Sequence, residues 1–274
     1  MVVAGFGLVG IGLASVLSSI FSRLLALKFV YSKSHPEMKI SSEHAIGKAK
    51  KIVFLLWHNA SRFGVVLVGV FLIWRANVLI AASLLGLSEA ASYGLAIQLF
   101  FMLNTVASVP LSISLPKINA LRAQSKHQEV YSGFSMLLVL SLSMYLAGSV
   151  LIFSVGDYLL AFINSPTRLP ESLVLGSMIL VFFLEINHGS CANFIATGNK
   201  TPFAAAAIIT GVTIVVASIS LTPFLGVWGL VIAQGVVQLS YNNWKWPLEV
   251  ARILRVSYFR MLKDGFWFML KYKF

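Results

Sequence analysis

Residues 185–202 read Glu-Ile-Asn-His-Gly-Ser-Cys-Ala-Asn-Phe-Ile-Ala-Thr-Gly-Asn-Lys-Thr-Pro. The stretch begins with an acid and a histidine inside a long apolar segment. It ends in a Gly-Asn-Lys turn that we expect to reverse the chain. Because the segments on both sides are strongly apolar, the first question is which solvent surrounds these polar groups.

The composition answers that question. Apolar residues make up 58% of the 274 residues, charged residues make up 11%, and the mean hydropathy is +0.86. In soluble domains, roughly a quarter of all residues are charged. Apolar runs of about 20 residues, the length of a membrane-spanning helix, recur along the chain, and the two-residue alternation of a transmembrane barrel is absent. We therefore predict an all-α fold, a polytopic transmembrane helix bundle.

The apolar segments and their linkers define the expected topology. We expect seven spans, at 1–30, 52–85, 91–115, 132–155, 172–196, 202–223 and 224–243. Polar loops fill 116–131 and 197–201, Pro202 stands in the first turn of its helix, and Pro223 ends that helix. The domain organisation is then a helix at 1–30, a basic linker at 31–51, a six-helix bundle at 52–247 and a tail at 248–274.

The basic residues orient this topology. All Lys and Arg except Arg23, Arg62, Arg75 and Arg168 lie in 28–51, 117–126, 200 and 245–273. Basic loops stay on the cytoplasmic side, so we expect the N-terminus outside and the C-terminus inside. Because this topology also accounts for the excess of basic residues, we expect no nucleic-acid partner. Residues 244–247, Trp-Lys-Trp-Pro, are predicted to anchor the inner interface. The tail is predicted to lie as an amphipathic segment on an anionic inner leaflet.

Two charges lie deep inside predicted spans. Arg75 is about 15 Å from the outer end of its span at the helical rise, and Glu185 is about 20 Å from the outer end of its own. Their similar depths predict that they pair with each other. Such a pair is either a structural ion pair or a functional pair that opens for substrate, and the sequence leaves both readings open.

Further polar residues accompany these charges. Asn59, Arg62 and Asn77 fall on one helical face, although Arg62 could also anchor near the inner headgroups. His188 stands one turn after Glu185, where it either shares a proton with that acid or packs as a hydrogen-bonded side chain. Gln234, Gln238 and Asn242 follow at intervals of four, a stripe that either lines an aqueous cavity or links helices.

The sequence contains none of the residue motifs of common enzyme active sites. The nine acids form no close pair and no Asp-x-Asp, Cys191 is the single cysteine, and no glycine-rich phosphate loop appears. The spacing of the histidines supports no metal site. We therefore expect no enzyme and no cofactor.

Five motifs together resemble one family. They are Pro-Lys-Ile-Asn-Ala-Leu-Arg-Ala at 116–123, Leu-Glu-Ile-Asn-His at 184–188, Thr-Gly-Asn-Lys-Thr-Pro-Phe at 197–203, Gly-Val-Trp-Gly-Leu at 226–230, and Gln-Leu-Ser-Tyr-Asn-Asn-Trp-Lys-Trp-Pro at 238–247. In order and spacing, from residue 51 to 248, they resemble the polysaccharide flippases. These are O-antigen and lipid-linked oligosaccharide translocases of the multidrug/oligosaccharidyl-lipid/polysaccharide exporter superfamily.

The resemblance implies two six-helix bundles that rock around a central cavity in the bacterial inner membrane and flip a polyprenyl-pyrophosphate-linked sugar unit. Residues 1–30 resemble the last helix of the first bundle, 31–51 the linker, and 52–247 the second bundle. The family's first five helices have no counterpart here, so we expect a fragment or a truncated product. Membrane lipids and the polysaccharide polymerase machinery are the other implied partners.

On this reading the candidate site residues form a translocation path. Arg75 and Arg62 would attract the pyrophosphate, polar groups including Asn59, Asn77, Gln234 and Gln238 would contact sugar hydroxyls, and Glu185 with His188 would complete the path. The alternatives are a cation-coupled drug exporter of the same superfamily, a membrane-embedded glycosyltransferase or ligase, and a non-transporting remnant.

Overall fold

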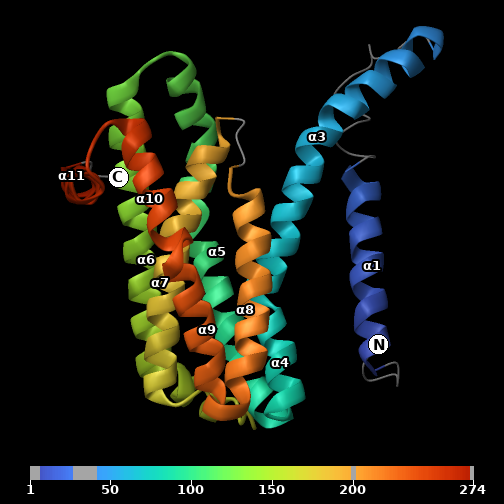
Figure 1. The fold of residues 1–274 in the computed structure, drawn as a ribbon, viewed down its shortest axis with the longest axis vertical. Coiled ribbons are helices and arrows are strands. Elements are labelled where there is room, and N and C mark those ends of the chain that lie inside the picture. The colour runs from blue at the N-terminus through green and yellow to red at the C-terminus, as the bar shows by residue number, and fades with distance from the viewer. Residues whose placement is uncertain (1–6, 27–41, 199–201, 272–274) are drawn as a thin grey trace. The chain divides into compact units, whose positions relative to one another are not determined.

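The computed structural model describes residues 7–26, 42–198 and 202–271. Every regular element in these ranges is an α-helix, which confirms the predicted all-α class (Figure 1). The chain divides into two compact units, Met1–His58 and Asn59–Phe274. Helix α1 (Gly7–Ala26) lies in the first unit, within the predicted span 1–30, and helix α3 (Ser42–Trp74) crosses the boundary. The last part of the predicted linker 31–51 is therefore helical, and its residues up to 41 lie outside the described ranges.

The apolar run 52–85 is two helices. Helix α3 ends at Trp74, and helix α4 (Ala76–Leu84) begins after Arg75. The amide of Arg75 still donates to the Phe71 carbonyl at 2.8 Å, whereas the Val78 amide donates to the Arg75 carbonyl at 3.2 Å. The second bond spans three residues, so the chain tightens by one 3₁₀-type turn at the arginine.

Helices α5 (Leu87–Ala123) and α6 (His127–Phe162) extend beyond their predicted spans. Each is about 55 Å long, while the hydrocarbon core of a bilayer is about 30 Å thick. The predicted loop at 116–131 is therefore wrong, because only Gln124, Ser125 and Lys126 separate the two helices. Ser125 takes a positive φ of 57° in this turn. The basic residues of the segment lie mostly on helical extensions, where Lys and Arg are good helix formers.

Helix α7 (Ser172–Ala196) coincides with the predicted span 172–196. Helix α8 (Ala204–Leu225) starts two residues after Pro202 and contains Pro223, so both proline predictions are wrong. The helix ends at Gly226 instead, which has φ 57° and supplies the positive φ that the reversal needs. Helix α9 (Val227–Ser240) follows at once.

The predicted span 224–243 is also interrupted. Helix α9 ends at Ser240, Tyr241 leaves helical geometry with φ −146°, and helix α10 (Asn242–Leu254) continues. The Trp-Lys-Trp-Pro segment therefore lies inside a helix. Trp246 is buried and packs edge-on against Phe203, whereas Trp244 is 48% exposed. Only one of the two predicted interface anchors is exposed.

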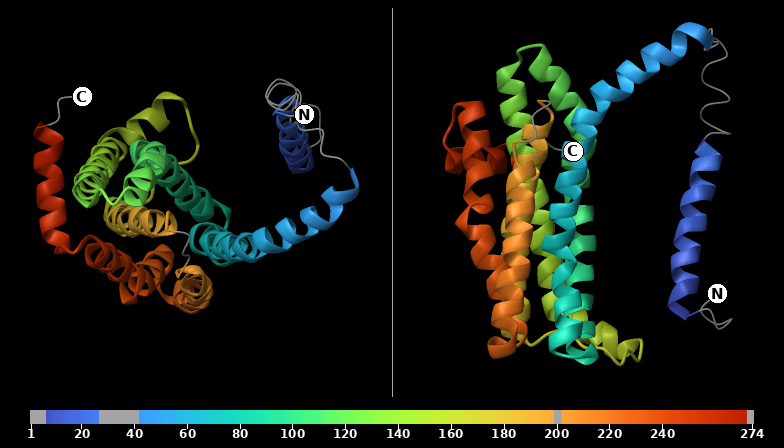
Figure 2. Two further views of the ribbon diagram at one scale, coloured as in Figure 1. Left: turned by 90° about the horizontal axis from the view of Figure 1, so that it is seen from above. Right: turned by 45° about the vertical axis from the view of Figure 1, so that its right-hand side comes forward.

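The last helix, α11 (Tyr258–Lys271), packs on α6 and crosses the direction of the bundle. Figure 1 shows it end-on where the neighbouring helices run lengthwise, and the view from above in Figure 2 shows it lengthwise where they are end-on. The predicted tail is thus a helix in its own right, and it lies across the bundle.

Among the described residues, five segments are long and apolar enough to cross a membrane: Ala60–Leu84, Leu87–Ala123, His127–Phe162, Ser172–Ala196 and Ala204–Leu225. The break at Tyr241 shortens α9 and α10, and the apolar part of α1 is the shorter stretch Val16–Leu25. The membrane-bundle character is confirmed, while the count of seven spans stays a prediction.

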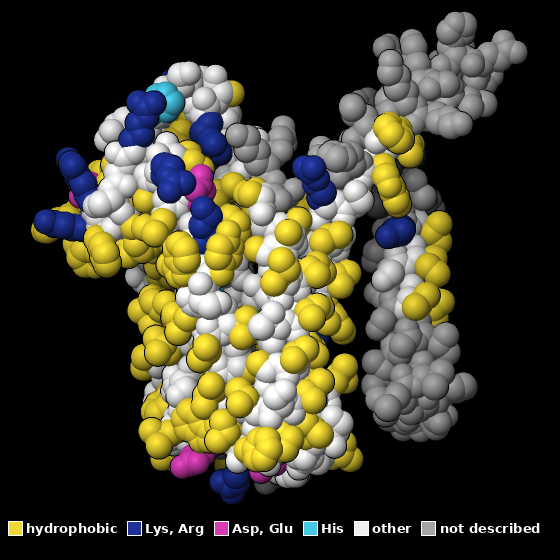
Figure 3. All heavy atoms as spheres, viewed as in Figure 1, with side chains coloured by type: hydrophobic (Ala, Val, Ile, Leu, Met, Phe, Trp, Pro, Cys, Tyr) yellow, Lys and Arg dark blue, Asp and Glu magenta, His cyan; other side chains and the backbone are white. Residues whose placement is uncertain are grey.

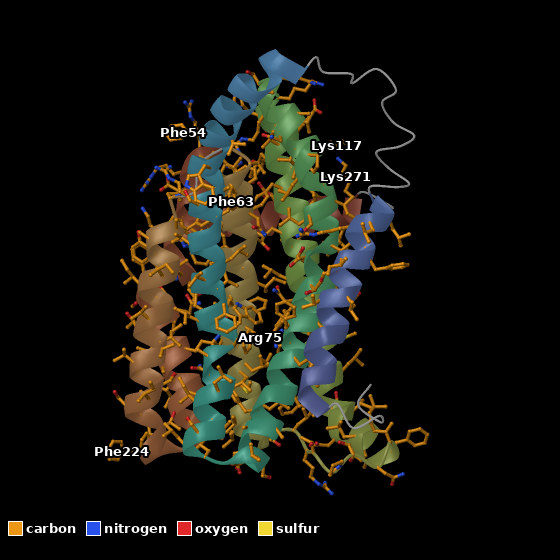
Figure 4. All side chains as sticks on the ribbon, turned by 90° about the vertical axis from the view of Figure 1, so that its right-hand side faces the viewer. Phe54, Phe63, Arg75, Lys117, Phe224 and Lys271 are labelled. Carbon is orange, nitrogen blue, oxygen red and sulfur yellow. The ribbon has the colours of Figure 1, made fainter. Side chains whose placement is uncertain are left out.

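The surface of the Asn59–Phe274 unit has the distribution expected for a membrane bundle. Lys and Arg gather at the end near α11 and the α5–α6 turn, and apolar side chains cover the wall below them (Figure 3). Figure 4 places Lys117 and Lys271 at this end and Phe224 at the opposite one. This separation agrees with the charge rule used above, and the orientation itself stays a prediction.

Candidate functional site

A cavity of about 290 Å³ lies within the Asn59–Phe274 unit, between α3, α5, α7, α8 and α10. Its wall combines aromatic and small apolar groups with polar ones. The polar side chains are Asn104, Ser108, Glu185, His188, Asn193 and Asn242, with Ser190 beside them. The cavity is therefore the one place where the described bundle gathers several of the predicted polar residues around open space.

Helix α7 builds most of this wall because of its spacing. Glu185, His188, Gly189 and Ala192 stand at positions i, i+3, i+4 and i+7 and so share one helical face. A Cβ atom added to Gly189 would meet nothing within 4 Å outside its own helix. The two small residues thus leave room in front of the polar ones.

The opposite wall depends on a close contact between α3 and α8. A Cβ atom on Gly69 would lie 2.6 Å from the Ala207 carbonyl carbon, and one on Gly211 would lie 2.8 Å from the Leu72 Cβ. Glycine at both positions lets the two backbones touch, as small residues do between membrane helices. This contact fixes Val70 and Ala207 at the cavity edge.

Glu185 is 6% exposed and is held by neutral donors. Gln234 Nε2 donates to Oε2 at 2.9 Å, and Gln238 Nε2 donates to Oε1 at 3.2 Å. The indole of Trp74 is a third side-chain donor to the same group. In the described residues no Lys or Arg nitrogen comes within 4.0 Å of Glu185.

The polar chain continues from Gln238 toward the basic end. Asn242 Nδ2 donates to Gln238 Oε1 at 2.8 Å and to Thr210 Oγ1 at 3.0 Å, and Trp246 Nε1 donates to Asn242 Oδ1 at 3.0 Å. These side chains are buried. The structure brings the predicted stripe of Gln234, Gln238 and Asn242 together chiefly as links between helices, and only Asn242 reaches the cavity wall.

His188 lines the cavity but is not bonded to Glu185. Its Nδ1 lies 3.2 Å from the Leu184 carbonyl oxygen and 2.8 Å from Asn243 Oδ1. Because the Leu184 carbonyl oxygen can only accept, Nδ1 carries the proton, and Nε2 is then the acceptor of the neutral ring. The predicted alternative of a hydrogen-bonded histidine is the one realised, with Asn243 of α10 as its partner.

The predicted pair of Arg75 and Glu185 is not formed. Arg75 is exposed at the α3–α4 break, and its guanidinium lies 5.2 Å from the centroid of the Phe101 ring. The adjacent Trp74 is buried and faces Glu185. Successive residues of a helix point about 100° apart, so the arginine is directed elsewhere. The similar predicted depths of Arg75 and Glu185 concern their positions along the helix axes. They do not determine the direction in which each side chain points around its helix.

Arg75 instead lines a second hollow of about 780 Å³ between α3, α4, α5 and residues 160–167. Gln98, Ser165 and Thr167 are its other polar residues. Figure 4 shows Arg75 between the two ends of the bundle, far from both Phe224 and Lys117. In the described residues no carboxylate lies within ion-pair distance of this arginine.

The remaining predicted residues separate. Arg62 is exposed on α3, away from both hollows. Asn77 is fully buried, where its Nδ2 donates to Tyr93 Oη at 3.5 Å and its Oδ1 accepts from Ser218 Oγ at 2.9 Å. It therefore links α4, α5 and α8. The side chain of Asn59 lies outside the described residues.

Sequence reasoning missed three residues of the cavity wall, Trp74, Asn104 and Ser108, and one hydrogen-bond partner, Asn243. Asn104 and Ser108 lie at i and i+4 on α5, and Ser108 Oγ donates to Asn104 Oδ1 at 3.4 Å. Their spacing within an apolar helix could have identified them. Trp74 and Asn243 carry no such signal, because an aromatic residue or an amide at a helix break is common in any bundle.

Several of the sequence motifs contact one another in space. Arg122 Nη1 donates to Thr197 Oγ1 at 2.8 Å and to the Phe194 carbonyl at 3.3 Å, which ties the end of α5 to the end of α7. Its guanidinium also lies 4.9 Å from the Phe194 ring centroid. Motif residues thus hold the bundle together beside the cavity, whatever it binds.

Comparison of the chain with protein-family models, with curated proteins and with solved structures finds no match. In the described ranges, no three His, Cys, Asp or Glu side chains gather to hold a metal ion. The chemistry available at the cavity is therefore hydrogen bonding by amides, hydroxyls and one imidazole, with a carboxylate at the back. At the second hollow it is one cation with neutral polar neighbours.

Proposed function

We propose that this chain forms a helix bundle of a transporter that moves a lipid-linked oligosaccharide across a bacterial inner membrane. The observation that carries the proposal is Arg75, an exposed cation at a helix break inside a membrane-length segment. A cation at this depth is costly against lipid, so such residues face water, protein or a ligand. Its hollow is the natural place for an anion.

A phosphate-bearing lipid fits this hollow. Arginine presents several N–H groups in a fixed plane and binds phosphate oxygens in a bidentate manner. Helix α4 rises about 14 Å from the break to its far end, so a bilayer of about 30 Å whose hydrocarbon boundary lay at that end would have Arg75 near its middle. A pyrophosphate carried through the membrane would pass this depth, while its polyprenyl tail stays against the apolar wall.

The polar cavity fits the sugar end of such a molecule. Asn104, Ser108, Asn193 and Asn242 offer neutral donors and acceptors of the kind that hydroxyl groups require. Trp74 lines this cavity and Arg75 lines the second hollow, so two adjacent residues of the chain contribute to the two sites. The ordered motifs that resemble polysaccharide flippases favour the same substrate class.

The proposal is tested in cells that need the transporter to display a surface polysaccharide. Replacing Arg75 by Ala in the protein should abolish display, and replacing it by Lys, which keeps the charge without the bidentate fork, should restore part of it. Arg62→Ala is the matched control, because Arg62 is an exposed arginine of α3 that lines neither hollow. Normal display by the Arg75→Ala variant would refute the role of Arg75.

One observation favours a second candidate, a cation-coupled exporter. Glu185 is buried beside a polar cavity and is surrounded by neutral donors in the described residues. A buried carboxylate without a counter-charge is unfavourable, so a proton or metal cation would stabilise it. If Glu185→Gln removes dependence on an ion gradient while Arg75→Ala leaves transport intact, the exporter is the correct class.

A further inference from the structure

The outward surface of α11 lies away from both hollows and combines apolar with cationic side chains. Phe259 is 82% exposed, and Trp267 is 61% exposed. The exposed apolar residues of the helix are Phe259, Phe266, Trp267 and Leu270, and its exposed basic residues are Arg260, Lys263 and Lys271. At about 100° per residue, Phe259, Phe266 and Leu270 fall within about 40° of one another, and the basic residues lie beside them.

The position of α11 on the bundle matches a membrane surface. The helix lies across the bundle direction (Figures 1 and 2) and passes α6 at Ser135. Between Ser135 and Phe162, α6 rises about 40 Å. A bilayer measures about 30 Å across its hydrocarbon and about 40–45 Å with headgroups. α11 therefore crosses α6 at headgroup level, at the end of the unit where Lys and Arg gather (Figure 3).

Close contacts hold α11 at this level. A Cβ atom on Gly265 would fall within 3 Å of the Ser135 carbonyl, so only glycine allows this approach to α6. Tyr131 Oη donates to Asp264 Oδ2 at 2.6 Å, and Tyr258 Oη donates to Asn187 Oδ1 at 2.5 Å on α7. Burial raises the pKa of the Tyr258 hydroxyl above its ordinary value, so this bond persists to a more alkaline pH than an exposed tyrosine would allow.

We propose that α11 is a membrane-surface helix that binds the headgroups of anionic lipids and is clamped to α6 and α7 at a fixed depth. Phe259, Phe266 and Leu270 would enter the boundary between headgroups and acyl chains. Lys263 and Lys271 have no carboxylate within ion-pair distance in the described residues, so lipid phosphates supply their counter-charge. This inference does not depend on the proposed transport function.

The test uses the whole chain with Cys191, its single cysteine, replaced by Ala. An environment-sensitive fluorophore is attached to a cysteine placed by Leu270→Cys, and the protein is reconstituted into vesicles of phosphatidylcholine or of phosphatidylcholine with phosphatidylglycerol. Quenching by nitroxide-labelled lipid is compared with quenching by aqueous iodide. The matched control label replaces Gln124, an exposed residue of the turn that projects beyond α11.

The Leu270 label should be quenched by lipid nitroxide more than by iodide, and more in the anionic vesicles than in the neutral ones. Replacing Arg260, Lys263 and Lys271 together by Gln should make the quenching of the Leu270 label by lipid nitroxide equal in the two vesicle types. The Gln124 label should be quenched by iodide more than by lipid nitroxide in every case. Dominant iodide quenching at Leu270 would overturn the proposal by placing α11 in water. Quenching by neither agent would overturn it by showing that protein covers this face.

Discussion

The chain of buried amides between α7, α9 and α10 yields a prediction whose size can be worked out. Gln238→Leu keeps the side-chain volume similar but removes two hydrogen bonds, one to Glu185 at 3.2 Å and one from Asn242 at 2.8 Å. A bond between side chains of membrane helices contributes about 0.6 kcal/mol on average and up to about 1.7 kcal/mol. Losing both bonds should therefore lower the free energy of unfolding by about 1–3 kcal/mol.

The assay is reversible unfolding of the whole chain in mixed micelles of increasing denaturing detergent. Gln98→Leu is the matched control, because Gln98 is exposed and should change stability by less than about 0.5 kcal/mol. A double-mutant cycle with Glu185→Leu, which removes the acceptor oxygens, should give a coupling energy of about 0.5 kcal/mol or more, since the two side chains are in contact. Additive effects, or a Gln238→Leu variant as stable as the control, would show that the chain of bonds is not formed.

Two further predictions test the fold. Gly229→Ala should destabilise by about 2 kcal/mol or more, because its Cβ would lie 2.6 Å from a backbone nitrogen of α8. Gly64→Ala, whose Cβ meets nothing within 4 Å outside its own helix, should stabilise by about 0.5–1 kcal/mol in the same unfolding assay, and the reverse ranking would contradict the α8–α9 contact. With Cys191 replaced by Ala, cysteines at Gln124 and at Arg168 should react with a membrane-impermeant maleimide from opposite sides, Gln124 from the cytoplasm; labelling from the same side would refute the topology.

The sequence predicted elements best where chemistry changes sharply. Helix α7 begins after Pro170 and Glu171 and ends at the Thr-Gly turn, so its apolar run and its polar borders coincide. The break at Arg75 lies inside an apolar run, where the apolar character resumes after one residue and marks no boundary. The break at Tyr241 stands among polar residues, Ser240, Asn242 and Asn243, where the predicted span 224–243 ends. The extensions of α5 and α6 were read as a loop because they are charged, although Lys, Arg and Ala favour helix as well as water.

The partners of the site were harder to predict than its members. Glu185 was identified from its depth, and it does lie in the bundle beside a polar cavity. Its bonds to Gln234 and Gln238 depend on the rotation of α9 about its own axis relative to α7. The hydrophobic pattern of a single sequence does not predict this rotation. The same limit applies to Arg75, whose direction is set by the tryptophan beside it.

The central claim is that a phosphate-bearing glycolipid crosses the membrane past Arg75. The most direct measurement is translocation of a polyprenyl-pyrophosphate oligosaccharide in vesicles that contain the protein, read from the exposure of the sugar to an added lectin. The account predicts transport by the wild type and at least about a tenfold loss for Arg75→Gln, equivalent to about 1.4 kcal/mol. Equal rates for the two proteins, or a wild type that moves no such lipid, would contradict it.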